Sequence, residues 1–179
     1  MSKVILALPQ KVHRALWDHL LPQRLEAEQA AFVFARLESN GDSARFGYLD
    51  WVPIPEVGFE YRSDVYLELA DISRAKVIKQ AHDLGASLIE FHSHTGAWPA
   101  AFSPSDLDGF TEFVPHVWWR LRGRPYAAVV VSRDSFDGLV WRKNPESPER
   151  LQGILVGGGF VQATGLTSLR GHHHDDPKE

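Results

Sequence analysis

Apolar residues follow two patterns along the chain: short continuous or alternating runs, and longer segments with an apolar residue every three or four positions. The first pattern predicts β-strands and the second predicts amphipathic α-helices. Strands are expected at 4–8, 30–37, 46–54, 65–69, 87–94, 125–132 and 139–143, and helices at 12–21, 72–84 and 104–114. Because helices and strands alternate, we expect an α/β fold with a mixed, mostly antiparallel sheet flanked by helices.

Glycine and proline mark the connections between these elements. Asn40-Gly41 favours a tight turn, which would make the two strands around it an antiparallel pair. Gly85 stands where a left-handed C-cap would end the second helix. Residues 53–64 contain two prolines and a glycine and are expected to form a loop. Asp137-Gly138 is expected to form a turn between the last two strands.

The chain has 179 residues, which is enough for one substantial core and short for two. We therefore expect one domain over residues 1–150. The glycine-rich segment 151–170 resists assignment and is compatible with membership of that domain. The His- and Asp-rich tail at 171–179 is expected to be disordered, because it has no apolar residues to dock it. Its histidines can bind metal adventitiously, but no dedicated site is expected there.

The composition excludes several classes of function. Lys and Arg number 19 and Asp and Glu number 23, giving a formal net charge of −4 without a long run of either sign, so no nucleic-acid partner is expected. The absence of cysteine excludes disulfides, thiol nucleophiles and cysteine-ligated metals. No apolar run is long enough for a signal-peptide core or a membrane span. We therefore expect a cytoplasmic protein with no membrane partner.

The residues with the clearest chemistry follow the strand at 87–94. His92 and His94 are two apart, so their side chains share one face of the strand while Ser93 points away. Asp106 lies in the first turn of the next helix, which a loop can return to the end of the strand. Two imidazole nitrogens and one carboxylate oxygen would leave a fourth position to water, as in catalytic zinc sites. We therefore predict Zn²⁺ bound by these two histidines and Asp106.

Each part of this motif also has a simpler interpretation. Ser103 and Asp106 have the spacing of a helix capping box, with Pro104 just inside the helix. Two histidines in alternate positions of a strand also occur by coincidence. The metal site is favoured by the combination, because the helix begins at the position from which Asp106 must reach the histidines.

These residues resemble the JAMM motif of the MPN+ (JAB-type) zinc metallopeptidases: histidine, any residue, histidine, a spacer, then serine, two residues and aspartate. His92, His94, Ser103 and Asp106 match in residue type and order. The chain departs from the family pattern at Thr95, where proline is usual, and its spacer is one residue longer than usual. The resemblance covers most of the chain, is closest to compact bacterial stand-alone members, and implies a single MPN (JAB) domain.

The family also uses a glutamate just before an apolar strand as the proton shuttle for the zinc-bound water. Glu28 matches, because it precedes the apolar run 30–34. Glu90 shares the parity of the two histidines and is the main rival, and Glu26 would serve if the register of the strand differed. A shuttle needs a pKa raised by partial desolvation. By the same resemblance, Ser103 would donate a hydrogen bond to the oxyanion of the tetrahedral intermediate.

The resemblance implies a hydrolase of the metalloprotease and isopeptidase class, deubiquitinase-like, that cleaves an isopeptide or peptide bond after the C-terminus of a ubiquitin-like protein, in deconjugation or precursor processing. The implied partners are a ubiquitin-like protein or its conjugates, and E1-like and E2-like (activating and conjugating) proteins of the same system. Two alternatives stay open: a non-catalytic MPN scaffold in a protein assembly, and a small-molecule amidohydrolase on the same zinc site.

Aromatic residues near the motif are candidates for a partner-binding surface. They are Trp98, Trp118, Trp119, Phe59 and Tyr61. Large aromatic side chains dominate many protein interfaces, but they are also common in cores. We expect at least two of the three tryptophans to belong to the core.

Overall fold

A computed structural model describes residues 3–169, so the predicted tail at 171–179 lies outside the described residues. About 40% of the residues lie in strands and 27% in helices. The strands are β1 (Lys3–Leu8), β2 (Ala30–Asn40), β3 (Ser43–Pro53), β4 (Phe59–Arg62), β5 (Leu67–Leu69), β6 (Ser87–Ser93), β7 (Tyr126–Val131), β8 (Phe136–Trp141), β9 (Glu149–Val156) and β10 (Gly159–Gln162). The helices are α1 (Gln10–Leu20), α2 (Asp71–Leu84) and α3 (Pro104–Arg120), with a 3-10 turn at Glu56–Gly58. Within this part of the chain, no helix combines the length and the apolar character needed to cross a membrane.

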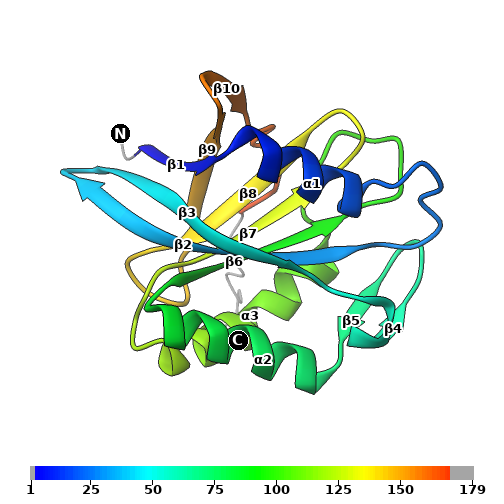
Figure 1. The fold of residues 1–179 in the computed structure, drawn as a ribbon, viewed down its shortest axis with the longest axis horizontal. Helices are drawn as coiled ribbons and strands as arrows, with labels where there is room; N and C mark the ends of the chain where they lie inside the picture. The colour runs from blue at the N-terminus through cyan, green and yellow to red at the C-terminus, as the bar shows by residue number, and fades with distance from the viewer. Residues whose placement is uncertain (1–2, 170–179) are drawn as a thin grey trace, which may run out of the picture.

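Seven strands close into a barrel in the order β1-β3-β2-β6-β7-β8-β9, because β9 also pairs with β1. β10 pairs with β9 outside this ring. β1 runs parallel to β3 and β9, and β6 runs parallel to β7, whereas the other neighbours in the ring are antiparallel. α1 lies on one side of the barrel, and α2 and α3 lie together on the other side (Figure 1).

The expected fold class, a helix-flanked sheet of MPN (JAB) type, is wrong. The sheet closes on itself, and strands predominate over the three helices. The closing strand β9 and its partner β10 lie in a glycine-rich part of the sequence for which no strand was expected. Gly157 has a positive φ of 60°, which allows the turn between them. Gly153 leaves room for β10, because a Cβ there would meet the Val161 carbonyl oxygen. The glycines that weaken the sequence signal are therefore needed for the pairing.

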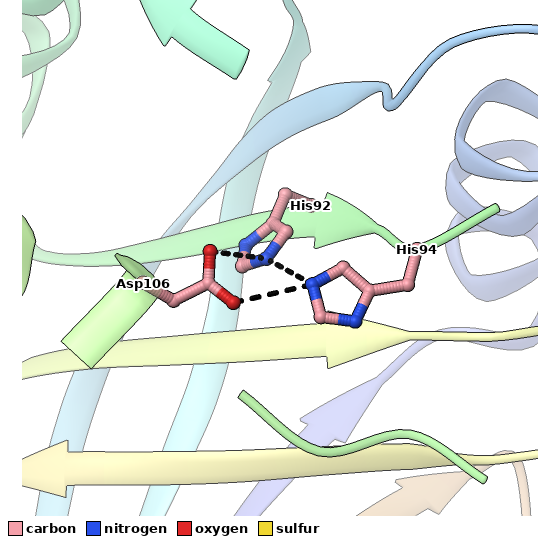
Figure 2. A group of neighbouring side chains, drawn as sticks. All are labelled: His92, His94 and Asp106. Carbon is pink, nitrogen blue, oxygen red and sulfur yellow. Dashed lines mark hydrogen bonds and ion pairs between the residues drawn. The ribbon is translucent and has the colours of Figure 1, made fainter. Parts of the chain in front are cut away.

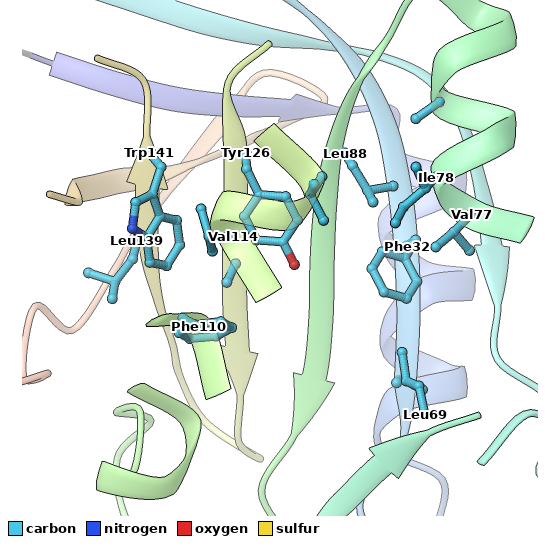
Figure 3. Packing of buried hydrophobic residues seen from close by; sticks show 14 of the residues in the cluster. Phe32, Leu69, Val77, Ile78, Leu88, Phe110, Val114, Tyr126, Leu139 and Trp141 are labelled. Atoms are coloured by element: carbon cyan, nitrogen blue, oxygen red, sulfur yellow. The ribbon is translucent and has the colours of Figure 1, made fainter. Parts of the chain in front are cut away.

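Two apolar clusters lie on opposite faces of the barrel wall, and strand residues alternate between them. On β2, Phe32 belongs to the outer cluster and Val33 to the inner one. In the outer cluster, strand residues pack with Ile78 of α2 and Val114 of α3 (Figure 3). The inner cluster draws residues from all seven strands of the barrel and includes Leu16 of α1. β6 and β7 are buried on both faces, which explains their nearly continuous apolar sequences.

The predicted turn before β3 and the predicted end of α2 are confirmed. Gly41 has a positive φ of 61°, and β2 and β3 form the expected antiparallel pair. Gly85 is the left-handed C-cap of α2. The turn expected at Asp137-Gly138 is wrong, because both residues lie inside β8. The connection from β7 to β8 is made by residues 132–135, where Ser132 N donates to Ser135 O.

Two further expectations need correction. The segment 53–64 is not entirely loop, since it contains β4, which pairs with β5 in a small separate sheet. α3 does not end at Val114 but continues past Pro115 to Arg120. Val114 and Val117 are both fully buried, so packing of this face stabilises the helix across the proline.

A buried carboxylate anchors the segment that follows β10. Asp137 on β8 is fully buried, and its Oδ2 accepts hydrogen bonds from the backbone nitrogen and the hydroxyl of Thr167, at 2.9 and 2.5 Å. Its Oδ1 accepts a hydrogen bond from Gly165 N at 3.1 Å. The Thr167 hydroxyl in turn accepts one from Phe102 N at 3.0 Å. These hydrogen bonds connect the segment after β10 to β8 and to the loop that leads into α3.

Asp137→Ala should lower the free energy of unfolding by about 3 kcal/mol, because several buried donors would lose their acceptor. Urea denaturation followed by tryptophan fluorescence measures this change. Asp134→Ala is the matched control, since Asp134 is exposed in the adjacent turn, and it should change the stability by less than about 0.5 kcal/mol. Equal effects of the two substitutions would contradict the anchoring role of Asp137.

Candidate metal centre

The end of β6 carries the two histidines of the motif. His92 is 2% exposed and lies on the outer face of β6, and His94 follows the last residue of that strand. Ser93 is buried on the opposite face, where its hydroxyl accepts a hydrogen bond from Gln29 N at 2.9 Å. The Nε2 atoms of the two imidazoles lie 3.3 Å apart (Figure 2). The strand and the residue after it therefore present two nitrogen donors at one point.

The first turn of α3 brings the carboxylate of Asp106 to the same point. Asp106 Oδ1 lies 3.4 Å from His92 Nε2, and Oδ2 lies 3.2 Å from His94 Nε2. Oδ2 also accepts hydrogen bonds from the backbone nitrogen and hydroxyl of Ser103, at 2.7 and 2.8 Å. The Ser103 hydroxyl accepts one from Asp106 N at 3.1 Å, which completes a capping box. The capping interpretation and the ligand interpretation are thus compatible, because the cap orients the carboxylate that faces the histidines.

The donor atoms have the spacing that one metal ion requires. The three side chains each offer a donor atom within 4.8 Å of the others. In a tetrahedral site with metal–ligand bonds of about 2.0–2.2 Å, neighbouring donors lie about 3.3–3.6 Å apart. The two Nε2 atoms lie 3.3 Å apart, and each lies 3.2 to 3.4 Å from a different oxygen of Asp106, so these separations are close to this range. Two imidazoles and one carboxylate form a donor set that zinc accepts, so these residues fit a zinc ion as three of its ligands.

Carboxylates near His92 favour a positive charge at this position. Burial acts to lower the pKa of His92, but hydrogen bonds and negative charge from Asp106 and Glu90 outweigh it and raise the pKa to about 10. Burial acts to raise the pKa of Asp106, but its hydrogen bonds with His92 and His94 hold that pKa well below its usual range. These half-buried carboxylates therefore favour a cation at the buried His92 ring, which a proton or a metal ion can supply.

Glu28 lies beside the converging nitrogens. It precedes β2, which pairs antiparallel with β6 so that Ala30 stands opposite His92. The Glu28 side chain is buried, and its Oε1 lies 3.9 Å from His94 Nε2. Burial raises the pKa of Glu28, although the neighbouring histidines partly oppose this shift. A buried carboxylate with a raised pKa has the properties of a general base.

The two alternative glutamates are placed differently. Glu90 lies on the outer face of β6, but its Oε1 is 3.7 Å from Nδ1 of His92, the ring nitrogen on the far side from Nε2. Its Oε2 accepts a hydrogen bond from the Tyr126 hydroxyl at 2.6 Å. Glu26 is exposed. Of the three candidate shuttles, Glu28 is the one whose carboxylate faces the Nε2 side of the histidines.

Sequence reasoning misjudged the aromatic residues near the site. Trp98, in the loop between His94 and α3, is 82% exposed, and Trp119 is 73% exposed, so the expectation that at least two tryptophans belong to the core is wrong. Trp118 is half-buried against the outer cluster. The contact between Tyr126 and Glu90 was missed as well, because Tyr126 begins an apolar strand and has the pattern of an ordinary core residue.

No protein-family model matches the chain, and no curated protein matches its sequence. Among solved structures, the chain is similar to the Trichoplax adhaerens STIL N-terminal domain, with 13% identity and a TM-score of 0.28. That match covers 73% of this chain and 37% of the other, so this chain spans little more than a third of its length.

Proposed function

We propose that this protein is a zinc-dependent hydrolase with JAMM-type chemistry, which cleaves an isopeptide or peptide bond after the C-terminus of a ubiquitin-like protein. The observation that carries this proposal is the convergence of His92, His94 and Asp106, with the buried Glu28 carboxylate beside them. The proposal is supported by these side chains. The fold does not support it, because the sheet closes into a barrel and is not the helix-flanked sheet expected from the resemblance.

Each residue of the centre has a defined task in this reaction. His92, His94 and Asp106 would hold the ion. A divalent ion with three protein ligands supplies a position for water and brings the pKa of that water to about 7. Glu28 accepts the proton that the attacking water loses and delivers it to the leaving nitrogen. Its raised pKa suits the first of these steps, because a more acidic carboxylate would accept the proton less readily.

Ser103 is assigned the stabilisation of the oxyanion that forms at the scissile carbonyl. Its hydroxyl hydrogen is donated to Asp106 Oδ2 at 2.8 Å, so it has to turn toward the substrate during the reaction. The backbone nitrogen of Ser103 also donates to Asp106, which keeps the carboxylate oriented while the hydroxyl turns.

Exposed aromatic side chains near the centre favour a polypeptide substrate over a small molecule. The loop that carries Trp98 is tied to the β4–β5 connection, where the Thr95 hydroxyl donates to Asp64 O at 2.6 Å. Tyr61 on β4 and Tyr66 at the end of that connection are both exposed, and their ring centroids lie 5.9 Å apart. Exposed aromatic residues of this kind are typical of surfaces that bind proteins.

The test compares two probes: ubiquitin carrying a C-terminal fluorogenic amide, and a glycyl-glycine bearing the same fluorogenic amide. We expect the zinc-loaded protein to release the fluorophore from ubiquitin with a kcat/KM at least tenfold higher than from the dipeptide. Treatment with a chelator should abolish this activity, and added zinc should restore it. Trp98→Ala should raise KM for the ubiquitin probe and leave the dipeptide reaction unchanged, because the dipeptide is too small to reach that surface.

Other results would select the alternatives. Cleavage of the dipeptide with equal or better kcat/KM would favour a small-molecule amidohydrolase. Zinc binding without cleavage of either probe, or of a linear fusion of two ubiquitins, would count against a peptidase and favour a non-catalytic scaffold.

A further inference from the structure

Three side chains on β6 and β7 form a connected series that leads away from the candidate metal centre. The Tyr126 hydroxyl donates to Glu90 Oε2 at 2.6 Å, and Glu90 Oε1 lies 3.7 Å from His92 Nδ1. β6 and β7 are parallel neighbours in which Leu88 stands opposite Tyr126, so all three side chains belong to the outer face of the barrel. None of these contacts is used by the proposed proton shuttle or oxyanion donor.

The position of His92 determines which ring nitrogen must carry hydrogen. Its Nε2 faces the other two donors, so a neutral ring that binds metal through Nε2 has its hydrogen on Nδ1. Glu90 Oε1 lies 3.7 Å from Nδ1, which is an ion-pair distance and not a direct hydrogen bond, and its negative charge favours the tautomer with hydrogen on Nδ1 and the ring orientation that directs this hydrogen toward it. Such outer partners of metal-binding histidines commonly change metal affinity by about 10–100-fold when they are removed.

Tyr126 restricts the orientation of Glu90. Glu90 borders a cavity of about 300 Å³ that is also lined by His92 and Asp106, so its carboxylate has room to turn away from the ring. The Tyr126 side chain is fully buried, and its ring centroid lies 5.8 Å from that of Trp141 (Figure 3). The ring of Phe113 lies 6.0 Å away, centroid to centroid. The Tyr126 hydroxyl is therefore a fixed donor. It holds one oxygen of Glu90 and leaves the other directed at His92.

We propose that Glu90 and Tyr126 are positioning residues, which hold His92 as the Nδ1–H tautomer and so set the zinc affinity of the centre. This inference depends on the proposed zinc centre and extends it by two residues outside the ligand set. It gives Glu90 a role that differs from proton shuttling, because its carboxylate faces the side of the ring away from the donor atoms.

The experiment measures zinc affinity by competition with a chromophoric chelator. It uses the full-length chain in which His172, His173 and His174 are changed to alanine, so that the tail cannot bind zinc. Glu90→Gln should weaken zinc binding by about 10–100-fold and Tyr126→Phe by about tenfold. Glu112→Gln is the matched control, because Glu112 lines the same cavity, and it should bind zinc as the parent does. Circular dichroism of the zinc-free proteins shows whether each variant is folded.

A second readout reports the tautomer directly. In proton NMR spectra of the zinc form, the His92 Nδ1–H should give a downfield, exchange-protected signal in the parent, and it should be lost or shifted upfield in Glu90→Gln. If Glu90→Gln bound zinc with the parental affinity and kept the His92 Nδ1–H signal unchanged, the positioning role of Glu90 and Tyr126 would be wrong, and the metal centre itself would stand. Failure of the parent to bind zinc would overturn the metal centre and this inference with it. Because Tyr126 is in the core, Glu90→Gln decides the result if Tyr126→Phe does not fold.

Discussion

Glu28→Gln should lower turnover by about 10²–10⁴-fold while the protein keeps its zinc and its fold. Glutamine has nearly the same shape as glutamate, but its amide cannot accept the proton from the attacking water. The free energy of unfolding should not fall, because burial already disfavours the charged form of Glu28, as its raised pKa indicates. Turnover of the ubiquitin probe at saturating zinc measures the loss, and elemental analysis of the same sample shows that the metal is retained.

Two matched substitutions make this measurement specific. Glu26→Gln removes the same charge two residues away, and it should be nearly neutral because Glu26 is exposed. Glu90→Gln should lose activity mainly at limiting zinc and recover it when zinc is saturating, since Glu90 faces Nδ1 of His92. If Glu90→Gln remained inactive at saturating zinc while Glu28→Gln kept the parental rate, the assignment of the proton shuttle would be wrong.

The candidate metal centre was largely predictable because it depends on local periodicity. Alternation along a strand places His92 and His94 on one face. The Ser-Pro pair at the start of the next helix places Asp106 in the first helical turn. The loop between His94 and α3 must then bring the first turn of α3 back to the end of β6. The capping box did not compete with this arrangement, because one carboxylate oxygen serves both the cap and the centre.

The closure of the barrel was not predictable from the same kind of pattern. Whether a curved sheet stays open or closes depends on a single long-range pairing, that of β9 with β1, between residues about 150 positions apart. The alternation of β9 is interrupted by Gly153, and the close approach of β10 requires that glycine. A residue that lowers the local strand signal thus permits the contact that defines the fold.

The series from Tyr126 to His92 was missed for a related reason. Parity placed Glu90 on the same face as the histidines, but it did not indicate which ring nitrogen the carboxylate would meet. That distinction depends on the parallel pairing of β6 with β7, which brings the Tyr126 hydroxyl to Glu90 from another strand. Parity along one strand gives a shared face, whereas the partners of a side chain on that face depend on the register of its neighbours.

The largest expected effect on the metal itself comes from His92→Ala combined with Asp106→Ala. The double variant removes one nitrogen and the carboxylate, so it leaves a single ligand, His94. We expect one zinc per chain in the parent and none above background in the double variant, by elemental analysis after gel filtration of proteins that lack the three tail histidines. Removing the tail histidines matters because a His-rich segment can retain zinc by itself.

Stability provides an independent measurement of the same loss. Zinc that binds only the folded state stabilises it by about 2.7 kcal/mol when its concentration is 100 times the dissociation constant. Added zinc should therefore raise the Tm of the parent and leave that of the double variant unchanged. Asp106→Ala also removes part of the helix cap, which should lower the zinc-free stability by about 1 kcal/mol, so the zinc-dependent shift in Tm is the relevant quantity.

His82→Ala combined with Asp108→Ala is the matched control, because it removes the same two residue types from exposed positions and should behave as the parent. Full zinc content and a parental zinc-dependent Tm shift in the His92→Ala, Asp106→Ala variant would show that the ion binds elsewhere in the protein.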